Sequence, residues 1–195
     1  MLQPVAVILA GGLATRMGGG DKGLLALGHG CLLDQVIDRL VPQVAGLALN
    51  ANGDPARFAR FGLPVLPDPV PDHPGPLAGV LAAMIWARAQ GATHVVTLPA
   101  DTPFAPCDLV PRLLLAAEGA GMAVASSGSR MHPTCALWPV TLADDLRAAL
   151  EAGQRRVMDF ARQHGAAEAV FDAGPPDPFM NINTPADLAQ AQGWL

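Results

Sequence analysis

The residues best suited to chemistry lie in a glycine-rich loop near the N-terminus. Residues 9–22 read Leu-Ala-Gly-Gly-Leu-Ala-Thr-Arg-Met-Gly-Gly-Gly-Asp-Lys. Glycines let main-chain N–H groups approach phosphate oxygens, while Arg16 can grip them with two parallel hydrogen bonds and Lys22 can act as a movable point charge. Of the twelve Lys and Arg residues in the sequence, Lys22 is the only lysine. The pattern predicts a phosphate-binding loop in preference to a plain surface loop.

Two familiar phosphate-binding motifs do not fit this loop. A Walker A motif ends in Gly-Lys-Ser/Thr, whereas Lys22 lies between Asp21 and Gly23, so the metal-binding hydroxyl is absent. Gly18, Gly20 and Gly23 match G-x-G-x-x-G in form. They lie well beyond the preceding apolar run, however, and no acidic residue ends the next predicted strand, so a dinucleotide fingerprint is disfavoured.

Asp101 is the strongest candidate for a metal ligand. It follows an apolar run in the sequence Pro-Ala-Asp-Thr-Pro, residues 99–103, where a carboxylate can hold Mg²⁺ against a triphosphate. The structural alternative is that Asp101 caps a helix starting near Pro103. The loop with its two cations favours the metal role.

Short apolar runs in the first half of the chain must position these residues. Strands are predicted at residues 5–10, 46–50, 63–66 and 94–98, and helices at 32–40, 55–61 and 76–90. Residues 5–10 are continuously apolar, which is typical of a strand covered by helices on both faces. Alternation of strands and helices predicts an α/β fold with a largely parallel sheet, whose ligands bind beyond the carboxyl ends of the strands. Asn50, Asp68, Asp101 and the glycine-rich loop should therefore converge on one edge.

The second half is less regular. Residues 122–126 and 132–138 are predicted to be paired strands, and helices are expected at 141–151 and 155–164. Residues 175–178 form a loop rich in proline. Thr184, Pro185 and Asp187 form a strong helix start, with Thr as N-cap and Pro at the first helical position.

Composition limits the class of protein. The 195 residues suit one domain, 51% of them are hydrophobic, and the apolar runs are too short to span a bilayer. The N-terminus lacks the basic region of an export signal, so a cytoplasmic location is expected. A net charge of −5 without a basic run argues against a nucleic-acid partner. Cys31, Cys107 and Cys135 are too scattered for a disulfide framework or a zinc site and are interpreted as small core residues.

The combined motifs resemble a known family. The residues Leu9-Ala10-Gly11-Gly12, Arg16-Met17-Gly18 and Asp21-Lys22 are similar to the signature of nucleotidyltransferases that act on sugar phosphates and on molybdopterin. Further matches narrow the resemblance to the molybdenum cofactor guanylyltransferase family and span nearly the whole chain. They are Gly75-Pro76-Leu77-Ala78-Gly79, Asp101-Thr102-Pro103, His132-Pro133-Thr134, Arg155-Arg156-Val157-Met158 and Asn181-Ile182-Asn183-Thr184-Pro185. Gly20 occupies a position that varies in such loops.

The resemblance implies a three-layer α/β/α, Rossmann-like nucleotidyltransferase fold with a mostly parallel sheet. It also implies transfer of GMP from GTP to molybdenum-molybdopterin, with Mg²⁺ as cofactor and pyrophosphate as second product. By position, the nucleotide-binding residues are Leu9, Ala10, Gly11, Gly12, Lys22, Asn50, Asp68 and Asp101, and Asp101 is also the metal ligand. Related cytidylyltransferases usually have Ala where Gly11 stands and lack the Gly-Pro-Leu-Ala-Gly run.

Catalysis by such an enzyme should come from alignment and charge neutralisation, because a phosphate nucleophile is already ionised. Arg16, Lys22 and Asp101 are the catalytic candidates. Asp68 can accept the two adjacent N–H donors of guanine, although an Asp before Pro69 is equally typical of a turn.

The acceptor is expected to bind in the half formed by residues 106–195, with the nucleotide in residues 1–105. The candidates on the pterin side are His132, Arg155, Arg156, Asn181 and Asn183, and Asn183 could also contact the metal. Cofactor-delivery proteins and apo-molybdoenzymes are further candidate partners. The alternatives are a molybdopterin cytidylyltransferase, a sugar-phosphate nucleotidyltransferase and a nucleotide-binding module without catalysis.

Overall fold

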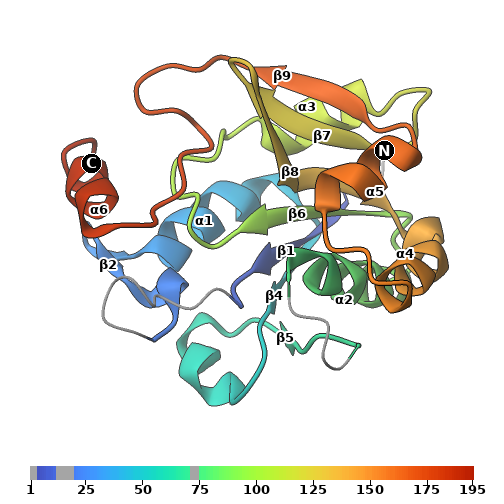
Figure 1. Cartoon of the computed structure of the whole chain (residues 1–195). Coiled ribbons are helices and arrows are strands. Elements are labelled where there is room, and N and C mark those ends of the chain that lie inside the picture. The colour runs from blue at the N-terminus through green and yellow to red at the C-terminus, as the bar shows by residue number, and fades with distance from the viewer. Residues whose placement is uncertain (1–3, 12–19, 71–74) are drawn as a thin grey trace.

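The computed structural model describes residues 4–11, 20–70 and 75–195 and is built around one seven-stranded sheet (Figure 1). The strand order is β5-β4-β1-β6-β8-β7-β9. All neighbouring pairs are parallel except the two that β8 makes with β6 and β7, so the sheet is mostly parallel, as predicted. The strands are β1 (Val5–Leu9), β4 (Gly46–Asn50), β5 (Val65–Leu66), β6 (His94–Pro99), β7 (Ala123–Ser127), β8 (Arg130–Pro139) and β9 (Ala167–Phe171).

Helices cover both faces of the sheet. They are α1 (Leu32–Leu40), α2 (Pro76–Ala89), α3 (Leu109–Ala116), α4 (Ala143–Glu151), α5 (Val157–Gln163) and α6 (Pro185–Gln192), with short 3₁₀ helices that include η4 (Pro55–Phe61). No helix in the described ranges is long and apolar enough to cross a membrane.

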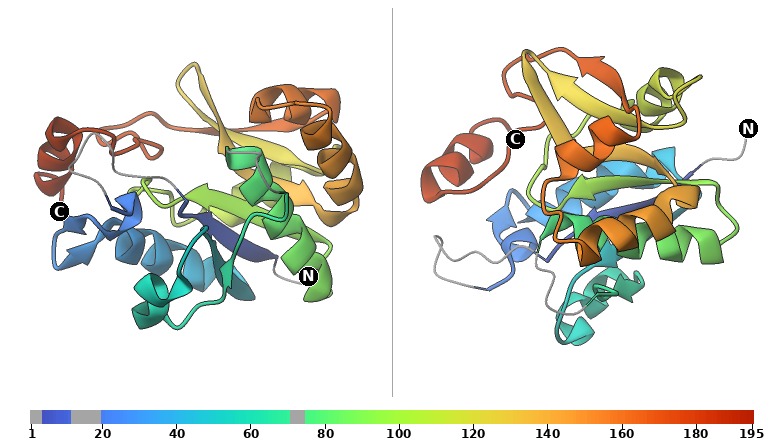
Figure 2. Two further views of the ribbon diagram at one scale, coloured as in Figure 1. Left: turned by 60° about the horizontal axis from the view of Figure 1, so that its bottom comes forward. Right: turned by 45° about the vertical axis from the view of Figure 1, so that its right-hand side comes forward.

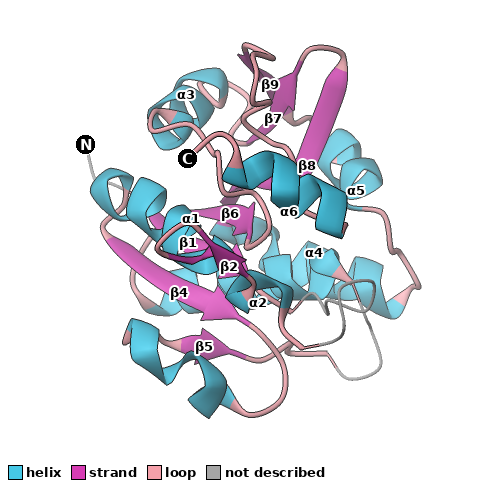
Figure 3. Cartoon of the chain, turned by 90° about the vertical axis from the view of Figure 1, so that its left-hand side faces the viewer, coloured by secondary structure: helices cyan, strands magenta, loops and turns pink. Residues whose placement is uncertain are grey.

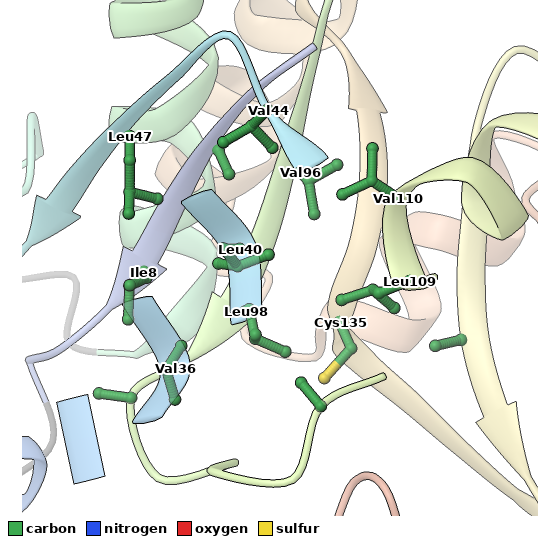
Figure 4. Packing of buried hydrophobic residues seen from close by; sticks show 14 of the residues in the cluster. Ile8, Val36, Leu40, Val44, Leu47, Val96, Leu98, Leu109, Val110 and Cys135 are labelled. Carbon is green, nitrogen blue, oxygen red and sulfur yellow. The ribbon is translucent and has the colours of Figure 1, made fainter. Parts of the chain in front are cut away.

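Alternating residues of β1 divide the core into two layers. Ala6 and Ile8 belong to one cluster of buried residues, which includes side chains of α1 and α3. Figure 4 shows Ile8 in this layer near Val36 and Leu40 of α1. Val5 and Val7 point to the other face and belong to the cluster that contains residues of α2, α4 and α5. On this face α4 lies beside α2 (Figure 2). The continuous apolar run is thus buried on both sides, and the predicted three-layer α/β/α architecture is confirmed.

A third, smaller cluster lies outside the main layers. Helix α6 packs near the short hairpin β2 (Ala26–Leu27) and β3 (Gly30–Cys31), although more than 150 residues separate them (Figure 3). The buried residues Leu27, Ile182 and Ala191 join the two segments. The end of the chain is therefore held next to the segment that follows the glycine-rich loop.

The register of the central strands sets the position of the site. Leu9, the last residue of β1, is paired with Asn50 at the end of β4 and with Pro99 at the end of β6. Asn50 is in turn paired with Leu66 at the end of β5. Because Asp68 and Asp101 each follow a strand end by two residues, the predicted convergence on one edge is confirmed.

One alternative and one prediction from the sequence are wrong. The alternative in which Asp101 caps a helix is excluded, since the chain is irregular from residue 102 until α3 begins at Leu109 with Asp108 as its N-cap. The predicted core position is wrong for Cys107. Cys107 is exposed, whereas Cys31 and Cys135 are buried as predicted, and all three are free thiols. Cys107 lies in the irregular connection before α3, outside the core layers.

Candidate active site

A cavity of about 400 Å³ opens at the carboxyl ends of β1, β4 and β6. Seven of the predicted nucleotide-binding residues line it, namely Leu9, Ala10, Gly11, Lys22, Asn50, Asp68 and Asp101. The structure therefore brings together residues that lie up to 92 positions apart, from Leu9 to Asp101. Gly12 and Arg16 fall outside the described residues.

Lys22 is the central cation of this cavity. Its ammonium group donates to the carboxylate of Asp101 and to the side-chain oxygen of Asn183. The Lys22 and Asp101 side chains are only 14% and 15% exposed, so water screens this ion pair less than it would screen a surface pair. The lysine singled out from the sequence thus links the N-terminal half of the chain to the C-terminal segment.

The cap of α6 holds Asn183 in this position. Oδ2 of Asp187 accepts from the backbone N–H groups of Asn183 (2.9 Å) and Thr184 (2.8 Å), while Oγ1 of Thr184 accepts from the Asp187 N–H at 3.1 Å. The hydrogen bond from Asn183 is the main cause that lowers the pKa of Asp187. This capping box confirms the helix start predicted at Thr184, and it fixes the residue that contacts Lys22.

Asn181 is held beside the segment that carries Asp101. Its side-chain oxygen accepts from Oγ1 of Thr102 at 3.1 Å, and the backbone N–H of Ile182 donates to the Asp101 carbonyl at 3.0 Å. Residues 181–183 are therefore docked against the segment that carries Asp101. Of the acceptor-side candidates, Asn181 and Asn183 are brought to the site.

A second cluster of polar side chains, formed by Asn50, Asn52 and Asp68, lies at the ends of β4 and β5. Nδ2 of Asn50 donates to Oδ1 of Asp68 at 2.9 Å, and Nδ2 of Asn52 donates to Oδ2 at 2.7 Å. The backbone N–H of Asp68 returns a hydrogen bond to Oδ1 of Asn52 at 2.8 Å. Both oxygens of Asp68 are thereby oriented, and a carboxylate keeps further lone pairs for donors of a ligand.

His132 does not line the cavity in the described part of the chain. Its ring is buried, stacks on Phe179 with centroids 4.6 Å apart, and lies 2.8 Å through Nε2 from Oγ of Ser127. Because that hydroxyl donates to the carboxylate of Asp177, at 3.0 and 3.1 Å from its two oxygens, its oxygen is left to accept from His132. Burial lowers the pKa of His132. The structure places His132 in a buried polar cluster that anchors residues 177–179.

Arg155 and Arg156 are exposed at the start of α5. The guanidinium of Arg155 donates to backbone carbonyls of Leu150 and Gln154, at 3.4 and 3.1 Å. Neither arginine lines the cavity defined by the described residues. The structure therefore separates this pair from Lys22 and Asp101.

Several further residues line the cavity that the sequence did not single out as site residues, although most of them stand in the quoted motifs. They are Gly23, Asn52, Gly75, Pro76, Pro99, Ala100 and Thr134. Asn52 could have been predicted, because residues i and i+2 point to the same side of an extended chain and Asn50 is a candidate from the sequence. Gly75 has a φ of 135°, which favours glycine, and it allows the chain to enter α2 beside the cavity.

The oxygens around Lys22 could also hold a metal ion. No group of three or more His, Cys, Asp or Glu side chains suited to a metal occurs within residues 4–11, 20–70 and 75–195. Asp101 and Asn183 nevertheless direct two oxygens at one cationic atom, Nζ of Lys22. Such a pair suits a cation that takes its other ligands from phosphate and water, as Mg²⁺ commonly does.

A cavity at the carboxyl edge of a mostly parallel sheet, lined by Gly11, Lys22 and Asp101, is the place where α/β proteins of this class bind their ligands. Residues 6–168 match the family described as the MobA-like NTP transferase domain. A protein from Cereibacter sphaeroides named molybdenum cofactor guanylyltransferase is 58% identical over 192 residues, which cover 97% of this chain and 95% of that protein. A protein of the same name from Mesorhizobium japonicum is 54% identical, covering 97% and 94%. The chain belongs to the molybdenum cofactor guanylyltransferase family.

The fold agrees with that assignment. The crystal structure of molybdopterin-guanine dinucleotide biosynthesis protein A from Archaeoglobus fulgidus superimposes with a TM-score of 0.74, covering 97% of both chains at 21% sequence identity. The architecture inferred from the sequence resemblance is thus shared with a solved protein.

Proposed function

We propose that the protein transfers GMP from GTP to molybdenum-molybdopterin, giving the guanine dinucleotide form of the cofactor and pyrophosphate. The observation that carries the proposal is the meeting of Lys22, Asp101 and Asn183 at the head of a cavity whose other end presents the oriented carboxylate of Asp68. The names of the curated relatives support the choice of a guanine nucleotide and a pterin acceptor over the alternatives.

The reaction forms one phosphorus–oxygen bond and breaks another. An oxygen of the terminal phosphate of the pterin attacks the α-phosphorus of GTP, and the electron pair of the breaking bond leaves with pyrophosphate. The nucleophile is already ionised, so no strong general base is required. Catalysis then comes from alignment of the two substrates and from neutralisation of phosphate charge. Lys22 has three N–H donors that can be shared between Asp101 and a phosphate oxygen.

Mg²⁺ is proposed to bind beside Lys22, on oxygen lone pairs of Asp101 and Asn183 that the ammonium does not use. Asp101 and Asn183 would hold it, and when bound it would neutralise phosphate charge. Arg16 belongs to the same proposal through the sequence pattern alone. The main-chain segment from Leu9 to Gly11 at the end of β1 would approach the phosphates.

The base is proposed to lie against Asp68. Guanine presents N1–H and its exocyclic amine side by side, and a carboxylate can accept both. Asn50 and Asn52 already orient the two oxygens of Asp68, which favours this role over that of a simple turn residue. Adenine offers no such pair of donors on that edge.

The acceptor is proposed to bind on the Asn181 and Asn183 side of the cavity, in residues 106–195. The position of Asn183 next to Lys22 supports this choice. A cytoplasmic location and contacts with delivery proteins or apo-molybdoenzymes belong to the same proposal.

Incubation of the protein with Mg²⁺, molybdenum-molybdopterin and GTP, CTP or ATP tests the function. The expected product is the guanine dinucleotide form with one equivalent of pyrophosphate, from GTP only. Asp101→Asn is the matched control, because it keeps the size of the side chain but removes a charged ligand and should be nearly inactive. A cytosine product, or turnover with a sugar phosphate in place of the pterin, would overturn the proposal.

A further inference from the structure

We propose that Arg57 is a positioning residue that holds the two ends of the nucleotide site, Lys22 and Asp68, at a fixed separation. The inference rests on the proposed function, in which the triphosphate lies at Lys22 and the base at Asp68. Arg57 lies in η4, the 3₁₀ helix between β4 and β5, and does not line the cavity in the described part of the chain.

Arg57 joins two loops of the site. Its Nε lies 2.7 Å from Oδ2 of Asp21, the residue directly before Lys22, and a terminal nitrogen donates to the backbone carbonyl of Asn52 at 2.5 Å. The side chains of Arg57 and Asp21 are 30% and 12% exposed, so this contact is largely covered. One guanidinium therefore touches both the end of the glycine-rich loop and the turn that follows β4.

The turn that follows β4 contacts Asp68, the residue proposed to bind the base. Asn52 makes two hydrogen bonds with Asp68. Its Nδ2 donates to Oδ2 of Asp68, and its Oδ1 accepts from the backbone N–H of Asp68. A continuous path of polar contacts thus runs from Asp21 through Arg57 and Asn52 to Asp68. The contact with Asp21 is an ion pair in which Nε makes no aligned hydrogen bond, whereas the terminal nitrogen of Arg57 donates to Asn52.

Gly53 makes room for the connection. It has a φ of 82°, and a Cβ atom there would lie 2.8 Å from a terminal nitrogen of Arg57. The positive φ favours glycine at this position. A side chain at position 53 would have to displace the end of Arg57.

A fixed separation matters most for a ligand that spans both ends. When one end of GTP has bound, the other end meets its partner at a high effective concentration only if the two subsites are correctly spaced. A less fixed spacing should weaken the binding of GTP without weakening the binding of ligands that fill only one subsite. This pattern distinguishes positioning from direct contact.

The test compares intact and divided ligands in wild type and in Arg57→Ala. Dissociation constants are measured for GTP, guanosine and tripolyphosphate with Mg²⁺, the latter two by competition against labelled GTP. We expect GTP to bind roughly tenfold more weakly to the variant, since small misplacements in such sites are costly. Guanosine and tripolyphosphate should each change less than about twofold. Arg57→Lys should show the same pattern, since a single ammonium cannot contact both Asp21 and Asn52 as two separate guanidinium nitrogens do.

Arg60→Ala is the matched control. Arg60 is in the same 3₁₀ helix, has a 55% exposed side chain and pairs with Asp34, away from the path, so all three ligands should bind as in wild type. Equal weakening of GTP and tripolyphosphate in Arg57→Ala would overturn the inference in favour of a direct or electrostatic effect on phosphate. Unchanged GTP binding in both Arg57 variants would also overturn it. Failure of the proposed function would appear instead in wild type, as no preference for GTP over ATP.

Discussion

Asn50 occupies the space that a side chain at position 79 would need. A Cβ atom built on Gly79 would lie well inside van der Waals contact with Oδ1 of Asn50, and 3.0 Å from Cδ2 of Leu9. Gly79 is in α2 and Asn50 ends β4, so the helix can approach the strand only because this residue is glycine. The Asn50 amide is thereby held where it donates to Asp68 and to the Leu66 carbonyl.

Gly79→Ala should therefore weaken GTP binding about tenfold and lower the stability of the protein. The new methyl displaces Asn50 and releases Asp68, whereas Ala in place of Gly favours the helix by roughly 1 kcal/mol and offsets part of the strain. The measurement is the GTP dissociation constant together with the melting temperature. A double-mutant cycle supplies the control, because in an Asn50→Ala background the substitution at Gly79 should have no further effect on affinity. Additive losses would show that Gly79 acts independently of Asn50.

The elements with clear local signals are predictable from the sequence. The continuous run at β1, the amphipathic spacing of α1 and the cap at Thr184 are all decided by neighbouring residues, and all three are confirmed. Helix α3 was missed because Pro111 stands in it, yet proline is tolerated in a first turn, whose N–H groups lack helical partners. Strand β9 was missed although its burial alternates over Ala169, Val170 and Phe171.

The site was predictable only in part. Strand ends collect at one edge of a parallel sheet, so Asn50, Asp68 and Asp101 could be grouped from the sequence. The contact of Lys22 with Asn183 spans 161 residues and depends on how α6 docks, which no local pattern encodes. For the same reason His132 looked available to a ligand, although its ring is covered by Phe179.

Removal of the Lys22 ammonium should slow GMP transfer by roughly a hundredfold without unfolding the protein. Lys22→Ala deletes the cation that contacts Asp101 and Asn183, and Lys22→Arg should also be impaired, since a planar fork does not replace a compact ammonium. Steady-state kinetics with GTP and the pterin measure the effect. Arg162→Ala, which removes an exposed cation at the end of α5, should behave like wild type. Normal turnover of both Lys22 variants would remove Lys22 from the mechanism.

Stability should fall as the pH drops below the ordinary pKa of histidine, about 6.5. Burial lowers the pKa of His132, so the unfolded chain binds a proton more readily than the folded protein. The stability that the neutral ring contributes is complete above the unfolded pKa and is lost as the pH falls toward the folded one. Nearby Asp177 and Arg130 act on this pKa in opposite directions.

Thermal unfolding between pH 7.5 and pH 5.5 measures this dependence. His132→Gln should show a smaller decrease in melting temperature over the interval than wild type, because the titrating group is gone. His29→Gln, at an exposed position, should keep the wild-type dependence. An identical decrease in all three proteins would assign the pH effect to other groups.

The choice of base depends on Asp68 in the proposed function. If Asp68 accepts the two donors of guanine, Asp68→Asn replaces one acceptor by a donor. The kcat/KM for GTP should then fall more than that for ATP. A buried polar mismatch of this kind costs about 1–3 kcal/mol, enough to lower the GTP preference by roughly ten- to a hundredfold. The measurement is the ratio of kcat/KM for GTP and ATP in wild type and variant.

The structure supplies a sharper control for this experiment. In Asp68→Asn alone, the new amide can also face the Nδ2 donor of Asn50 or Asn52, which would disturb the site whatever the ligand. Combining Asp68→Asn with Asn52→Asp restores an acceptor for that amide while leaving an amide at position 68. The double variant should therefore regain stability and ATP use but not the preference for GTP. A GTP-to-ATP ratio equal to that of wild type in both variants would exclude base reading by Asp68 and assign its carboxylate to the ribose or to the turn before Pro69.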